Sequence, residues 1–178
     1  MRKIITRIGI LLSIAIICVS VPLFFNHLEN VAWTAAKERT LEKARQTGNT
    51  IKSARHLYTS EVVDEAQHVA HMHVTHDYRD TKYDSLGGAI PLPATFSLDL
   101  ADAMSDTNTT IKLFSKYPFP IRQNRVLTDF ESEAWDFYVQ TDDVRKPFYS
   151  IDEETGILQY AIADRMVHAS CVECHNSH

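Results

Sequence analysis

The chain ends with two cysteines and a histidine whose spacing suits one particular kind of chemistry. Cys171, Cys174 and His175 form a Cys-x-x-Cys-His motif. Two thiols three residues apart can add to the two vinyl groups of one porphyrin, and the adjacent imidazole then ligates the iron. The motif therefore predicts one covalently attached haem c. Cys171 and Cys174 would be its attachment sites and His175 the proximal iron ligand.

The same region of the chain allows two alternatives to haem. On a helix, Cys171, Cys174, His175 and His178 lie at positions i, i+3, i+4 and i+7, so they share one face and could hold a tetrahedral zinc ion. The two cysteines could instead form a redox-active disulfide, although no thioredoxin-like βαβ pattern surrounds them. Haem is favoured because the complete five-residue motif is the more specific pattern.

A cluster of histidines earlier in the chain offers candidates for a sixth iron ligand. Its members are His68, His71, His73 and His76. Solvated surface histidines are the alternative interpretation of such a cluster. If a helix that begins at Ile51 continues through this region at about 100° per residue, Met72, His73 and His76 share an apolar stripe with Tyr58. The candidates for a distal iron ligand are therefore His76, His73 and Met72.

Composition excludes several classes of function. The chain has 178 residues, an apolar fraction of 44% and a formal net charge of -5, which suit one domain with a core of its own. No run of lysine and arginine follows the first residues, so nucleic acid is not an expected partner. No acid/base pair, nucleophile arrangement or phosphate-binding loop stands out from composition. An enzyme is therefore not expected.

The N-terminal region is predicted to anchor the chain in a bacterial inner membrane. Residues 8–25 carry no charge, and as a helix they would extend about 27 Å, close to the thickness of a bilayer core. Arg2, Lys3 and Arg7 precede them, so residues 1–7 should stay in the cytoplasm. The rest of the chain, with its haem, should then lie in the periplasm.

A cleaved signal peptide is the alternative for the same segment. Its apolar region would be unusually long, and no small-x-small cleavage site follows Val21. The residues before Cys18 also lack the small side chain that precedes a lipidated cysteine. An uncleaved anchor is favoured, with Cys18 as an ordinary apolar residue of the span.

Helical patterns follow the apolar segment. Residues 26–47 have alanine, glutamate and basic residues at helical spacing and predict a stalk that continues the span. Gly48-Asn49-Thr50 is predicted to end this helix, with Thr50 capping a second helix from residue 51 to about 70. An apolar stripe on that second helix includes Tyr58 and Val62.

The remainder, within a domain spanning residues 48–178, predicts short elements of both kinds. A loop over 76–88 is followed by a helix over 94–104, introduced by proline, and by a strand over 109–115. Thr128 and Glu131 form a capping-box pattern at the start of another helix. Residues 148–152 and 157–163 suit a hairpin around Gly156. The expected class is α+β, with a small antiparallel sheet and flanking helices.

Five segments, taken in order, resemble a known family. They are RHLYTSEVV (55–63), IPLPATF (90–96), PFPIR (118–122), FESEAW (130–135) and ADRMVHASCVECHNSH (163–178). Over residues 30–178 the chain resembles the c-haem-containing, PAS-like periplasmic sensor domains found in front of histidine kinases, nucleotide cyclases and chemoreceptor modules. The resemblance implies a PAS-like antiparallel sheet with long N-terminal helices, and haem held against the sheet by the C-terminal motif.

The sequence departs from this family at its end. Family members continue beyond the second histidine with a final strand, a second span and an output module, whereas this chain stops at His178. A truncated or abbreviated domain is therefore expected. Its output module or redox partner would lie outside this chain, and the stalk helices could pair in a homodimer.

Three functions are compatible with these patterns. The favoured one is a membrane-anchored monohaem c-type sensor domain that detects redox state or a small diatomic ligand. The second is a membrane-anchored monohaem cytochrome c that carries electrons between partners. The third is a zinc-stabilised periplasmic interaction domain, which would show no haem absorption.

Overall fold

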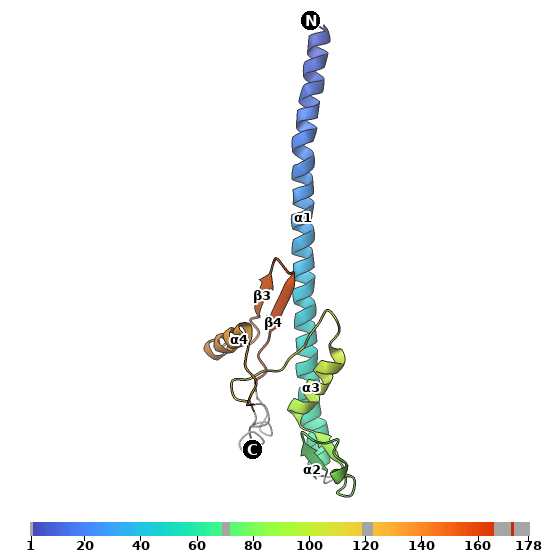
Figure 1. Cartoon of the computed structure of the whole chain (residues 1–178), viewed down its shortest axis with the longest axis vertical. Coiled ribbons are helices and arrows are strands. Elements are labelled where there is room, and N and C mark those ends of the chain that lie inside the picture. The colour runs from blue at the N-terminus through green and yellow to red at the C-terminus, as the bar shows by residue number, and fades with distance from the viewer. Residues whose placement is uncertain (1, 69–71, 119–122, 166–171, 173–178) are drawn as a thin grey trace. The chain divides into compact units, whose positions relative to one another are not determined.

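The computed structural model describes residues 2–68, 72–118, 123–165 and 172, with side chains from residue 7 onwards. The chain forms two compact units, Met1–Lys43 and Ala44–His178. One helix, α1 (Arg2–Leu57), accounts for the described part of the first unit and the beginning of the second (Figure 1).

The first unit exposes its apolar side chains. Leu11, Leu12 and Phe24 are 66%, 63% and 59% exposed. Among the described residues, α1 is the one helix long and apolar enough to cross a membrane, although a signal sequence near the N-terminus meets the same criteria. The apolar segment predicted over residues 8–25 is thus a helix that is suited to a single membrane span.

Helix α1 continues through Gly48-Asn49-Thr50, so the predicted helix break at these residues is wrong. The Thr50 hydroxyl donates to the Gln46 carbonyl at 2.9 Å, a bond made within a helix rather than at its N-cap. A Cβ built on Gly48 would lie 2.7 Å from Cδ1 of Ile162. The glycine therefore makes room for a distant segment instead of ending the helix.

A turn of wider helix follows α1 and shifts the buried face. The π-helical turn η1 (Tyr58–Val63) leads into α2 (Asp64–His68). Val63 is buried, whereas Val62 is 45% exposed, which corrects its predicted place on the apolar stripe. A π turn closes at i+5 rather than i+4, so the position on the face of Tyr58 passes from Val62 to Val63.

Residues beyond α2 form a short strand rather than more helix. Strand β1 (His73–Thr75) pairs in parallel with β2 (Ala89–Pro91). The helical projection that groups Met72, His73 and His76 therefore does not apply, because side chains on a strand alternate between two faces.

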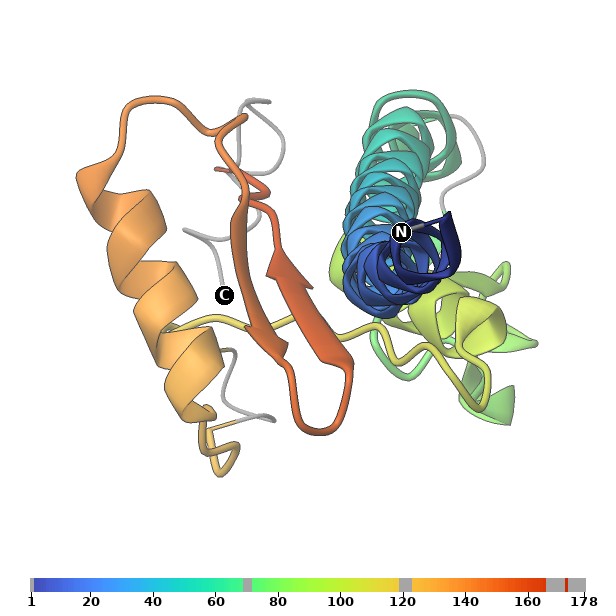
Figure 2. The same ribbon diagram turned by 90° about the horizontal axis from the view of Figure 1, so that it is seen from above.

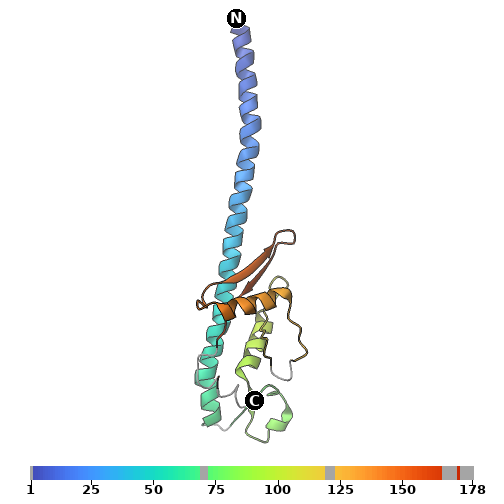
Figure 3. The same cartoon turned by 90° about the vertical axis from the view of Figure 1, so that its left-hand side faces the viewer.

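The loop predicted between these strands and the helix predicted after them are both present. The connection contains a 3-10 turn, η2 (Thr81–Tyr83), and α3 (Pro93–Met104) has proline in its first turn. The rings of Tyr58 and Phe96 stack with centroids 4.3 Å apart. This contact holds α3 against η1, and α3 lies beside the C-terminal end of α1 (Figure 3).

Helix α4 (Asp129–Gln140) begins as the sequence predicts. Its N-cap Thr128 accepts from the Glu131 amide at 3.2 Å, and the Glu131 carboxylate accepts from the Thr128 amide at 3.0 Å. Both halves of the capping box are therefore present, and two amides that lack helical partners are satisfied.

The predicted hairpin is confirmed. Strands β3 (Phe148–Asp152) and β4 (Ile157–Ala161) pair antiparallel, and Gly156 in the turn has φ of 70°, which favours glycine. Helix α4 lies against this hairpin (Figure 2). The Tyr138 hydroxyl of α4 donates to the Ala161 carbonyl at 2.7 Å, which fixes the helix to β4.

Residues 109–115 are not a strand within the described ranges, contrary to prediction. The amide of Ile111 donates to the Ser105 hydroxyl at 3.2 Å, and the Arg125 guanidinium donates to the Leu113 carbonyl. Side chains thus satisfy backbone groups that a strand partner would otherwise bond. The α+β class is confirmed, with a parallel pair β1–β2 and an antiparallel pair β3–β4.

Candidate functional site

The attachment motif lies almost entirely outside the described residues. Cys171, Cys174, His175 and His178 belong to the ranges for which the structure gives no description. Val172, inside the motif, is described and is 44% exposed. The haem prediction and its zinc and disulfide alternatives therefore remain predictions. What the structure does describe is the segment that leads into the motif.

Three residues on one face of α1 hold the segment that follows β4. Gly48 faces Ile162, and the Lys52 ammonium donates to the Ala163 carbonyl at 3.0 Å. One helical turn after Lys52, Arg55 contacts Asp164, the residue that follows Ala163. Because these α1 residues lie at i, i+4 and i+7, they form a continuous line along the helix.

The Nη2 of Arg55 donates to Asp164 Oδ1 at 2.6 Å. The two side chains are 18% and 19% exposed. Burial raises the pKa of Asp164 above its ordinary value, and the charges of Arg55 and Lys52 oppose that shift without cancelling it. Desolvation thus outweighs pairing here, as is common for buried ion pairs.

The guanidinium of Arg55 is not fully satisfied. Its Nε is buried and has no hydrogen-bond partner among the described residues. Buried polar groups are nearly always hydrogen-bonded in native proteins, so a donor without an acceptor calls for an explanation. This donor belongs to the contact between α1 and the segment that precedes the motif in the sequence.

The three candidate distal ligands differ in environment. Met72 is half-buried, and its backbone amide donates to the Ala66 carbonyl at 3.0 Å. His73, in β1, and His76, just after it, are exposed. The His73 ring lies 5.2 Å from that of Tyr83. Since the motif is not described, the structure does not bring these residues together with His175, and distal ligation remains a prediction.

The sequence places Tyr58 on an apolar stripe but does not predict the contacts that it makes. Its hydroxyl donates to the Pro91 carbonyl at 2.7 Å, and its ring stacks on Phe96. Burial raises the pKa of Tyr58 to about 12, so the phenol remains neutral at physiological pH. The signal was available, because Tyr58 falls within one of the segments that carry the family resemblance and Phe96 within another. Tyr58 fastens η1 to β2 and α3.

Residues 33–178 match the sequence model of the Tll0287-like family. The chain belongs to the Tll0287-like family. No curated protein and no solved structure matches it. The match begins within α1 and covers the whole of Ala44–His178, so it includes both the Arg55–Asp164 pair and the Cys-x-x-Cys-His motif.

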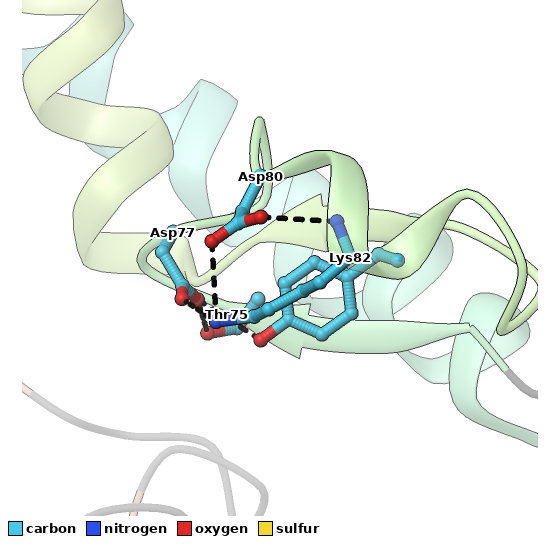
Figure 4. Close-up of polar contacts among 5 residues, drawn as sticks. Thr75, Asp77, Asp80 and Lys82 are labelled. Carbon is cyan, nitrogen blue, oxygen red and sulfur yellow. Dashed lines mark hydrogen bonds and ion pairs between the residues drawn. The ribbon is translucent and has the colours of Figure 1, made fainter.

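A second polar cluster in the Tll0287-like domain shapes the turn between β1 and β2 (Figure 4). Asp77 accepts from the Thr75 hydroxyl at 2.5 Å, from the Tyr83 hydroxyl at 3.1 Å and from the Lys82 ammonium. Asp80 accepts from the Lys82 amide at 3.0 Å. The hydrogen bonds from Lys82 and Thr75 lower the pKa of Asp77. The polar groups of the cluster are hydrogen-bonded to one another, so the cluster stabilises the turn.

The donor set of the Tll0287-like domain fits haem c. Two thiols and a neighbouring imidazole would supply the covalent bonds and the proximal ligand that this cofactor needs. The cations on α1, with one buried donor left over, also suit a group that carries carboxylates. Within the described residues no three histidine, cysteine, aspartate or glutamate side chains form a metal site.

Proposed function

We propose that this Tll0287-like chain is a membrane-anchored periplasmic sensor domain with one covalently attached haem c, which detects redox state or a small diatomic ligand. The observation that carries the proposal is the motif Cys171-x-x-Cys174-His175 at the end of the matched region. The cysteines hold the porphyrin and His175 holds the iron. His76, His73 or Met72 supplies the distal ligand, if there is one.

A bound haem c would supply an iron centre that can be reduced or can bind a diatomic gas. The residues of the chain would hold the cofactor and connect it to α1. Support for that connection comes from Lys52 and Arg55, which bind the segment seven residues before Cys171. A sensor needs such a contact between its cofactor and an element that can transmit a change.

Two features support a periplasmic anchor. Residues 8–25 form an apolar helical segment without charge, and Arg2, Lys3 and Arg7 precede it. Positive charge before a span keeps that end in the cytoplasm. A PAS-like fold is also part of the proposal, supported by the α+β class and by the antiparallel hairpin β3–β4, which precedes the motif in the sequence.

Covalent haem attachment is tested by haem staining of denatured protein from a host with the c-type maturation machinery. The full chain should retain haem, and the Cys171→Ser, Cys174→Ser double variant should lose it. Cys18→Ser is the matched control, since Cys18 lies outside the motif, and it should retain haem. An unstained wild-type chain would overturn the proposal.

Sensing is separated from electron transport by spectra and turnover. Binding of CO or NO, or a structural difference between oxidised and reduced chains, is expected for a sensor. Rapid reversible electron exchange with a respiratory partner, without a structural difference between the oxidised and reduced chains, would instead indicate an electron carrier.

A further inference from the structure

The face of α1 that contacts residues 162–164 carries more positive than negative charge. Lys52 and Arg55 both bind the segment 163–164, where Asp164 supplies one carboxylate. The pair is mostly shielded from water, so an unbalanced cation here is more costly than one at the surface.

The geometry of Arg55 shows where a second anion fits. A guanidinium is a planar fork that can bond two carboxylates through separate nitrogens. Nη2 already bonds Asp164, whereas Nε is buried and has no acceptor within the described ranges. The Nε–H group of Arg55 is therefore a buried donor that remains available beside the bond to Asp164.

We propose that Arg55 bonds a haem propionate through Nε while its Nη2 holds Asp164. This inference rests on the proposed function. A haem attached at Cys171, seven residues after Asp164, brings two carboxylates of its own to this part of the chain. One of them balances the excess positive charge and satisfies the buried donor.

Arg55 would then be a positioning residue that joins the cofactor to α1. It lies three residues before η1, the π turn at the end of α1. When the iron changes its charge, the potential at the propionate changes as well. The relative strengths of the hydrogen bonds from Arg55 to the propionate and to Asp164 would then change. Because Arg55 belongs to α1, this change would reach the backbone of that helix.

The test uses the full haem-loaded chain and two substitutions of Arg55. Arg55→Gln should lower the reduction potential, because a nearby positive charge favours the less positive ferrous haem. Arg55→Lys keeps the charge but loses the fork, so its potential should move less. Both variants should shift the propionate bending bands in resonance Raman spectra. Arg79→Gln is the control, since Arg79 is 71% exposed and pairs with Asp99. It should change neither quantity.

Unchanged propionate bands in both Arg55 variants, with haem attached, would overturn this inference and leave the proposed function intact. A wild-type chain without haem would instead overturn the proposed function. If neither variant folds, the wild-type chain labelled with 15N-arginine decides. Its infrared difference spectrum between reduced and oxidised forms should contain guanidinium bands, and their absence would also overturn the inference.

Discussion

Helix α1 has two parts with opposite surroundings, and two of its glycines show the difference. A Cβ on Gly9 would meet nothing within 4 Å, whereas one on Gly48 would meet Ile162 at 2.7 Å. Before Ala44 the apolar side chains are exposed, and after it the helix face bonds residues more than 100 positions away, as in the Arg55–Asp164 pair. The same backbone geometry thus serves an exposed apolar segment and a packed one.

This contrast teaches that the helical pattern does not by itself identify what covers a helix. The N-terminal part is uniformly apolar over residues 8–25, which suits a solvent that is itself apolar. The C-terminal part presents a glycine and two basic residues, Gly48, Lys52 and Arg55, which contact residues 162–164. Four predictions break or sharpen this comparison.

The largest effect is expected from charges in the exposed part. Ile14→Arg together with Ile16→Arg places two charges within the apolar segment, each costing about 2.5–3.5 kcal/mol in a bilayer. Membrane fractionation should show loss of the chain from the inner membrane. Ala36→Arg, outside the apolar segment, should remain in the membrane. Retention of the double variant would contradict a span, and mass spectrometry of the mature N-terminus would show a cleaved signal.

Gly48→Leu should affect folding where Gly9→Leu does not. A larger side chain at Gly48 displaces Ile162, and overpacking of this kind costs about 1–3 kcal/mol. Denaturant unfolding should report the loss for Gly48→Leu. Gly9→Leu should cause none, because its site is open and leucine favours a helix. Equal stability of the two variants would show that the Ile162 contact is not made.

Two threonines predicted as caps should differ in their effect. Thr128→Ala removes one half of the capping box of α4 and should cost about 0.5–2 kcal/mol. Thr50→Ala removes an exposed bond to the Gln46 carbonyl within α1 and should stay within about 0.5 kcal/mol. Thermal melts of both variants check this. A larger loss for Thr50→Ala would restore the helix break at residue 48.

The smallest effects concern two carboxylates in packed and exposed surroundings. Burial raises the pKa of Asp164, so its contribution to stability falls as pH rises from 3.8 through the raised value. Bonds from Lys82 and Thr75 lower the pKa of Asp77, so its contribution is present above pH 3.8 and is lost below it. Asp164→Asn should reduce the loss of folding stability that occurs as pH rises. Asp77→Asn should reduce the loss of folding stability in acid.

Carboxyl NMR titrations of the wild-type chain measure both shifts directly. Displacements of the two pKa values in opposite directions are expected. A lowered pKa for Asp164 would mean that pairing with Arg55 outweighs its burial.

Several features were determined by the sequence alone because their causes are local. The capping box of Thr128 and Glu131, and the hairpin turn at Gly156, depend on residues within four positions of one another. The apolar segment 8–25 depends only on composition. The Cys-x-x-Cys-His motif is likewise a matter of spacing, so the prediction of a haem c and of its proximal ligand needs no fold and stays a prediction.

Other features were decided only by the tertiary structure. The Gly48-Asn49-Thr50 segment carries a local signal for a helix end, yet Ile162 packs on Gly48, and Lys52 and Arg55 bind residues 163 and 164. The burial of Val63 instead of Val62 depends on the π turn η1. Strand β1 pairs with β2 in the region over which the helical projection of the candidate distal ligands had been extended. Weak local propensities give way to burial and to long-range hydrogen bonds, which no short window of sequence contains.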